Sequence, residues 1–176
     1  MMTSRLKSIK QLISNIRQEK TMFALKLLAA LGCGLIAGVF FAFSSFVMNA
    51  LAQLPSDQGI AAMQAINIKV INPSFMVVFL GTAVACIFLA ISSLIKWHQP
   101  GVAYLLVGSL LYLVGTVGVT LAFNVPLNDA LAKVAPSSTN GANLWAIYLT
   151  NWTLWNHVRT IAAFLATGAI AIALCY

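Results

Sequence analysis

The ten residues 151–160, NWTLWNHVRT, place polar and ionisable side chains at the start of a long apolar segment. Trp152, Trp155, Asn156 and Arg159 are separated by steps of three and four residues, so a helix carries them on one face, while His157 projects to the side. A guanidinium makes several fixed hydrogen bonds to an oxygen-bearing ligand, and an imidazole exchanges protons near neutral pH. An arginine accompanied by asparagine and tryptophan on one face predicts the wall of a ligand pocket.

Polar residues, most of them uncharged and from other parts of the chain, fall at the same end of the predicted structure. They close or open the apolar segments at Ser44, Ser45, Asn49, Asn67, Lys69, Asn72, Asn124, Asn128, Asn151 and Asn156. Buried amides must be hydrogen-bonded, so their convergence indicates either a pocket for a polar ligand or a network that locks helices together. We favour the pocket. For Arg159 alone, a third reading is a side chain that snorkels to the membrane surface.

The elements that position these residues follow from hydropathy. The chain has 176 residues, 7% of them charged and 61% hydrophobic, which is too little polar surface for a soluble globule. A helix needs about 20 apolar residues to cross roughly 30 Å of hydrocarbon. The sequence therefore predicts an all-α membrane protein, a four-transmembrane-helix bundle in one domain (24–176), with spans at about 24–48, 74–95, 102–123 and 153–175.

Two further elements are predicted outside the spans. Residues 1–23 form a basic amphipathic N-terminal arm, with Leu6, Ile9, Ile13 and Ile16 on one helical face, which we expect on the membrane surface. After the first span, Ile60, Met63 and Ile66 have helical spacing behind Ser56, a candidate N-cap. This pattern predicts a short interfacial helix.

The distribution of positive charge predicts the orientation. Basic residues precede the first span, and Lys96 lies in the turn between the second and third spans, so both termini should be cytoplasmic. The polar end then faces outward, and the expected location is a bacterial inner (plasma) membrane.

The sparse cysteines and histidines argue against several kinds of site. Cys33, Cys86 and Cys175 form no CxxC pair, and His98 and His157 fall at opposite membrane faces. We therefore predict no metal site and no cofactor. The basic arm indicates contact with the lipid bilayer or a simple topology signal, and nucleic acid is not an expected partner.

Several motifs together resemble one known family. FNVPLNDAL at 123–131, then Trp152 and the stretch NHVR at 156–159, are similar to the signature of the anthrone oxygenases, small four-span membrane proteins long described as a domain of unknown function. The stretch AMQAINIKVINPSF at 62–75 is similar to bacterial members. The resemblance covers about residues 25–175.

The resemblance implies chemistry with molecular oxygen on a lipophilic aromatic or quinone-like substrate. Named members oxidise an anthrone to an anthraquinone, and an anthrone enolate can reduce dioxygen without a metal. On this reading His157 is the base, and Arg159 holds the enolate or peroxide oxygen. The substrate-binding residues would be Asn72, Asn124, Asn128, Trp152, Trp155 and Asn156.

Two functions stay open from the sequence. The first is a metal-free membrane oxidoreductase that binds a lipophilic aromatic small molecule. The second is a non-catalytic membrane protein that binds a lipophilic ligand or partner through the same polar end. The sequence leaves the oligomeric state open, a homo-oligomer included.

Overall fold

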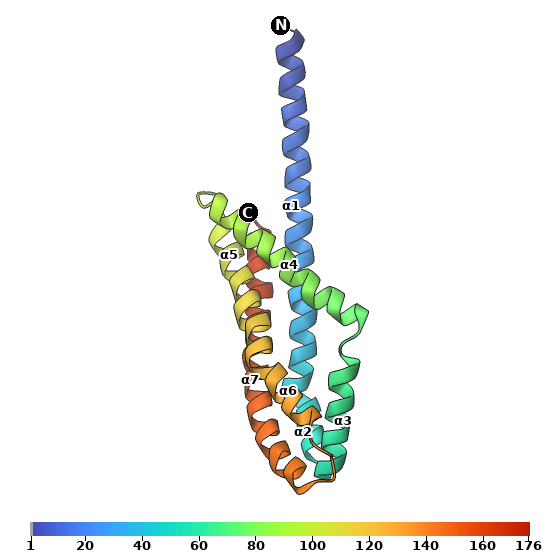
Figure 1. The fold of residues 1–176 in the computed structure, drawn as a ribbon. Helices are drawn as coiled ribbons and strands as arrows, with labels where there is room; N and C mark the ends of the chain where they lie inside the picture. Colours follow the sequence, from blue (N-terminus) through green and yellow to red (C-terminus); the bar gives the residue numbers. More distant parts are fainter. Residues whose placement is uncertain (1) are drawn as a thin grey trace.

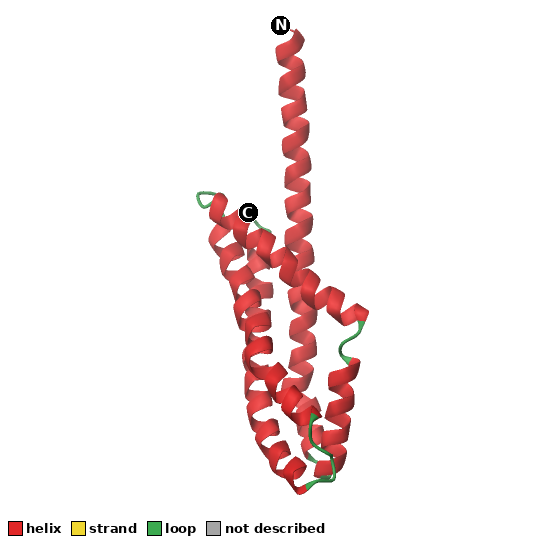
Figure 2. Ribbon diagram, viewed as in Figure 1, coloured by secondary structure: helices red, strands yellow, loops and turns green. Residues whose placement is uncertain are grey.

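The structure, a computed structural model, describes the backbone of residues 2–176 and the side chains of residues 9–176. Every regular element in this part of the chain is helical (Figure 2). In chain order the elements are α1 (Met2–Ala42), the π-helical η1 (Phe43–Val47), α2 (Met48–Ala52), α3 (Ser56–Lys69), α4 (Pro73–Ile95), α5 (Val102–Leu110), the π-helical η2 (Leu111–Gly118) and η3 (Thr120–Asn124), α6 (Val125–Ala132) and α7 (Thr139–Ala173).

Four continuous helical stretches are long and apolar enough to cross a membrane. They are Ile9–Ala52, Pro73–Ile95, Val102–Ala132 and Thr139–Ala173. In the bundle, α7 packs against α1 and α5, and α4 packs against the same two helices (Figure 1). The predictions of an integral membrane protein and of a four-helix bundle are therefore confirmed.

The N-terminal arm is continuous with the first span. Helix α1 has no break between Met2 and Ala42, and Figure 1 shows its first turns extending beyond the rest of the bundle. Ile9, Ile13 and Ile16 are exposed, while the predicted Leu6 lies outside the described side chains. A position on the membrane surface would require a bend in α1 that the structure does not have.

The helix predicted after the first span is α3, and its apolar face packs against protein. Ile60 and Met63 are fully buried in a cluster with Trp145 and Tyr148 of α7. Ser56 is the first helical residue and not the N-cap, which is Pro55 and makes no side-chain capping bond. The helix was therefore predicted correctly, but its apolar face contacts the bundle and not the membrane surface.

The segments between the predicted spans at 49–73 and 124–152 are largely helical. Helix α6 continues the third span, and α7 begins at Thr139, where the Ser138 hydroxyl accepts a hydrogen bond from the Gly141 amide at 3.0 Å. At about 1.5 Å per residue, the 35 residues of α7 extend about 50 Å, well beyond the hydrocarbon thickness. Hydropathy located the spans but not the helical extensions, because polar residues do not end a helix.

The buried core has two apolar clusters with a polar layer between them. One cluster includes Ile36, Phe40 and Tyr112, and the other includes Met63 and Trp152. Between them lie the buried polar residues Asn124, Asn156 and Arg159.

Close packing brings the third span against α7 at this layer. A Cβ atom on Gly115 would lie 2.6 Å from the Cβ of Ala162, one turn from Arg159. The missing side chain at Gly115 therefore permits the approach of η2 to α7.

The orientation of the bundle is a testable prediction. A reporter fused after Ala135 should read as non-cytoplasmic, and one fused after Gln99 as cytoplasmic, because positive charge concentrates on the side of the arm. Alkaline phosphatase and fluorescent-protein fusions in cells measure both. The reverse pattern would place the helical extensions in the cytoplasm.

Candidate functional site

The predicted stripe on α7 faces the interior of the bundle. Trp152, Asn156 and Arg159 have exposed fractions of 5%, 0% and 4%. His157 is exposed on another side of the helix, and Trp155 is half-buried with its ring stacked 3.7 Å from that of Phe123. The i+3 and i+4 spacing therefore identified the buried face, and the imidazole lies away from it.

Arg159 is held by neutral groups. Its Nη2 donates to Asn156 Oδ1 at 2.7 Å, and its Nη1 donates to the Thr120 hydroxyl at 3.2 Å. Its guanidinium carbon lies 4.1 Å from the ring centre of Phe40 and 5.1 Å from that of Trp152. Hydrogen bonds and cation–π contacts replace part of the hydration that a buried charge loses. This arginine does not snorkel.

Asn156 joins α7 to the first span. Its Nδ2 donates to the Phe40 carbonyl at 2.8 Å and to the Ser44 hydroxyl at 2.7 Å, while its Oδ1 accepts from Arg159. With Thr120 on the other side, the network connects the first, third and fourth spans. Of the two readings left open by the sequence, this part of the cluster fits the helix-locking network.

All three π-helical segments of the described chain lie close to this layer. Ser44 belongs to η1, and Thr120 and Asn124 belong to η3, which follows η2 after one residue. Asn124 Nδ2 donates to the Trp152 carbonyl at 3.1 Å. Segments of π-helix are rare and occur often at functional sites. The hydropathy and spacing of these residues do not indicate a π-helix.

The layer also holds buried polar atoms that have no partner among the described residues. They are Thr116 Oγ1, Asn124 Oδ1 and Arg159 Nε. Arg159 lines neither of two large cavities found among the described residues, one of about 570 Å³ and one of about 760 Å³. The prediction that Arg159 forms the wall of a pocket therefore gains no support from these cavities.

A cavity of about 570 Å³ lies between α3 and α6, at the end of the bundle away from the N-terminus (Figure 1). Its volume is within the range of about 300–1,000 Å³ that is usual for small-molecule pockets. The lining residues are Gln64, Asn67, Ile68, Ile71, Val125, Asn128, Asp129 and Ala132. Of the predicted site residues, only Asn128 lines it.

The amide of Asn128 has a fixed orientation. Its Oδ1 accepts from the Tyr148 hydroxyl at 2.7 Å and from Trp152 Nε1 at 2.8 Å. Because an indole N–H only donates, the oxygen must face Trp152. Asn128 Nδ2 makes no hydrogen bond to any described residue, so its two N–H groups remain available to a molecule in the cavity.

Asn128 is also the link between the cavity and the buried layer. Asn67, another lining residue, donates to the Tyr148 hydroxyl at 3.5 Å. The guanidinium of Arg159 lies over the ring of Trp152. Side chains of the cavity are thus connected to the polar layer through Tyr148 and Trp152.

Asn72, predicted to bind substrate, is an exposed helix cap. Its Oδ1 accepts from the Phe75 amide at 3.1 Å and its Nδ2 donates to the Lys69 carbonyl at 2.9 Å. The Asn-Pro sequence at 72–73 is a normal way to start a helix, with proline at the first position. Asn72 therefore lies outside the cavity that contains Asn128.

Tyr148 and Asp129 were not among the predicted site residues, and Asn67 was predicted only as one of the polar residues that converge at this end of the bundle. Tyr148 lies four residues before Trp152, so the same stripe continues toward the start of α7. The signal was present but fell before the predicted fourth span, which begins at about residue 153. No three His, Cys, Asp or Glu side chains gather in the described part of the chain.

Comparison with known proteins identifies the family. Residues 75–169 match the family described as anthrone oxygenase, which is more than half of the chain and includes Asn128, Asn156 and Arg159. Neither the curated proteins nor the solved structures contain a significant match to the chain. The protein belongs to the anthrone oxygenase family.

Proposed function

We propose that this protein is a membrane oxygenase that converts a lipophilic aromatic ketone of the anthrone type into a quinone. The observation that carries the proposal is the fixed amide of Asn128, which presents free N–H donors to a cavity of about 570 Å³. Preorganised donors of this kind stabilise an oxyanion that develops during a reaction.

The lining of the cavity combines apolar and polar groups, as a lipophilic ketone requires. Ile68, Ile71 and Val125 supply apolar walls, and Asn128 and Asp129 supply polar groups on one side. A substrate concentrated in the bilayer would reach the outer end of the bundle from the membrane. A flat aromatic ring system can lie against the aliphatic walls with its carbonyl oxygen toward Asn128.

The reaction requires removal of a proton before oxygen reacts. We assign the base to Asp129, whose carboxylate is in the same cavity lining as Asn128, and not to His157, which does not line the cavity. The carboxylate removes a ring CH₂ proton, and Asn128 stabilises the negative charge on the enolate oxygen. The enolate then reduces dioxygen to a carbon-bound hydroperoxide, which loses water to leave a second carbonyl. One ketone and one O₂ give one quinone and one H₂O.

The alternative is a non-catalytic protein that binds a lipophilic carbonyl compound in the same cavity. The exposure of Asp129 favours it, because a general base acts best where the site excludes water. Turnover separates the two functions. Reconstituted protein supplied with anthrone should consume one O₂ per anthraquinone formed, whereas a binding protein would leave the uncatalysed rate unchanged.

The identity of the base is tested by two substitutions. Asp129→Asn should lower kcat by about 10²–10⁴-fold, the usual contribution of a general base. His157→Gln should leave kcat unchanged, since this side chain faces away from the cavity. Anthraquinone absorbance in proteoliposomes measures both variants. Loss of activity in His157→Gln with normal activity in Asp129→Asn would restore the assignment made from the sequence.

A further inference from the structure

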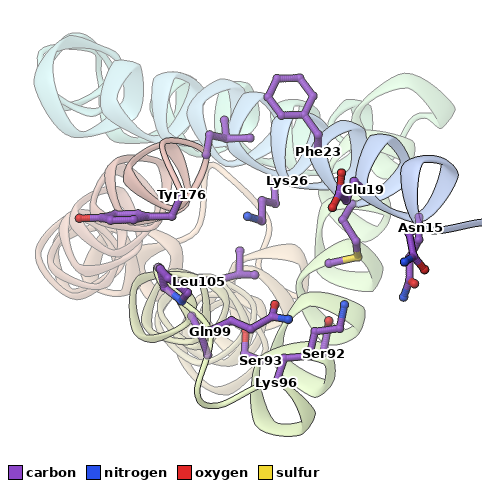
Figure 3. Close-up of a pocket in the computed structure, with 16 residues that line it drawn as sticks. Asn15, Glu19, Phe23, Lys26, Ser92, Ser93, Lys96, Gln99, Leu105 and Tyr176 are labelled. Carbon is purple, nitrogen blue, oxygen red and sulfur yellow. The ribbon is translucent and has the colours of Figure 1, made fainter. Parts of the chain in front are cut away.

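A second cavity, of about 760 Å³, lies at the other end of the bundle (Figure 3). It is bounded by the first span, the end of α4, the turn between α4 and α5, the start of α5 and the last residues of the chain. None of the residues assigned to the proposed reaction lines it.

Two lysines from different helices line this cavity. Figure 3 shows Lys26 of α1 extending into the space enclosed by the helices, while Lys96, which ends α4, lies across from α1. Both are partly buried, and Lys26 Nζ donates to the Ala173 carbonyl at 2.9 Å. Among the lining side chains Glu19 carries the single carboxylate, and no ion pair within 4.0 Å occurs among the described residues. The two ammonium groups therefore form no ion pair within the described part of the chain.

Neutral donors lie beside the lysines. Ser92 and Gln99 line the cavity, and neither side chain hydrogen-bonds to another described residue. The first residues of α5 also border it, and a helix N-terminus favours negative charge. Lysine charges, neutral donors and a helix N-terminus together form an arrangement that suits an anion rather than a cation.

The cavity lies at the depth where lipid headgroups are expected. Trp97, Tyr104 and Tyr176 are exposed around this end, and the rings of Tyr104 and Tyr176 are stacked. Exposed tryptophan and tyrosine mark the boundary between hydrocarbon and water. Phe23 and Leu105 add an apolar portion to the lining.

We propose that this cavity is a binding site for a phosphate group, held between Lys26 and Lys96. Basic pockets between membrane helices are known to bind anionic headgroups. The ligand is a phosphate ester: an anionic phospholipid supplies it with acyl chains that fit the apolar lining, and a free phosphate compound supplies the same group without them.

The test uses the full chain in dodecyl maltoside and three probes. Dioleoyl phosphatidylglycerol should bind. Dioleoyl phosphatidylcholine should bind more weakly because it has no net negative charge. Inorganic phosphate competes with phosphatidylglycerol only if the headgroup alone is recognised. Native mass spectrometry and titration calorimetry give the affinities. Binding of phosphatidylglycerol without competition by phosphate identifies a lipid site, and competition identifies a site for free phosphate as well.

Substitutions assign the binding to this cavity. Lys96→Gln should weaken phosphatidylglycerol binding about fivefold, and Lys26→Gln with Lys96→Gln roughly 25-fold, at about fivefold per lysine. Lys20→Gln removes one charge from the exposed part of α1 outside the cavity and should leave the affinity unchanged. If the double variant does not fold, Lys96→Gln alone decides, because its side chain makes no hydrogen bond to a described residue. Wild-type affinity in Lys96→Gln, no preference for phosphatidylglycerol over phosphatidylcholine, or an equal loss in Lys20→Gln would overturn the proposal.

Discussion

Asn156→Ala should destabilise the bundle by about 2–4 kcal/mol, the largest stability effect that we expect from one side chain. The substitution removes three hydrogen bonds, to the Phe40 carbonyl, to the Ser44 hydroxyl and from Arg159. A single interhelical hydrogen bond in a membrane protein averages about 0.6 kcal/mol, so these bonds alone do not account for the effect. The larger part comes from the guanidinium of Arg159, which stays buried and loses its shortest hydrogen bond.

Equilibrium unfolding in mixed dodecyl maltoside and SDS micelles, followed by circular dichroism, measures this loss. Asn151→Ala is the matched control, because Asn151 lies on the same helix with an exposed side chain. It should change the free energy of unfolding by less than about 0.5 kcal/mol. Equal effects of the two substitutions would mean that the polar layer does not lock the helices.

The double variant Asn156→Leu with Arg159→Met gives an independent check of the cause. If the cost of Asn156→Ala comes from an unpaired buried charge, removing that charge should recover part of it. Replacement of both partners by apolar groups of similar size is often close to neutral. The double variant should therefore be more stable than Asn156→Ala. A double variant that is less stable would assign the cost to packing around Asn156.

Hydropathy was sufficient to predict the spans, because a helix in hydrocarbon must satisfy its own backbone and needs a minimum apolar length. It could not show that α3 packs on α7, because an apolar stripe has the same pattern against lipid as against protein. Ile60 and Met63 illustrate this: their spacing indicated a helix, and only the fold shows that Trp145 and Tyr148 cover them. The helical extension at 139–152 was missed because Ser138 caps it within a segment that reads as polar.

The candidate site was predictable where it depends on the geometry of one helix. The spacing of Trp152, Asn156 and Arg159 gave a buried face because helical periodicity is local. The cavity depends on the approach of α3 to α6, which no local pattern contains, so nothing in the sequence singled out Asn67 among the polar residues of this end or assigned Asp129 to the site. His157 was chosen for its chemistry, and its exposure follows from being one residue out of phase with the stripe.

Asn128→Asp should keep the fold and lower kcat by about 10²–10³-fold, the effect of losing one oxyanion donor. An aspartate carboxylate has the size of the amide and can still accept from the Tyr148 hydroxyl and from Trp152 Nε1. It cannot donate, and its negative charge repels an enolate oxygen in the cavity. The substitution thus separates the role of Asn128 in the network from its proposed role toward the substrate.

Asn140→Asp makes the same chemical change at an exposed position in the first turn of α7 and serves as the control. Tryptophan fluorescence and unfolding should match the wild type for both variants. Anthraquinone formation at saturating anthrone should fall only in Asn128→Asp, with a smaller change in KM, because the interaction strengthens as the enolate forms. A fall in ligand affinity equal to the fall in kcat/KM, with kcat unchanged, would show that Asn128 binds the carbonyl without stabilising the enolate. Wild-type kinetics in Asn128→Asp would remove this amide from the reaction and leave it with the structural contacts to Tyr148 and Trp152 alone.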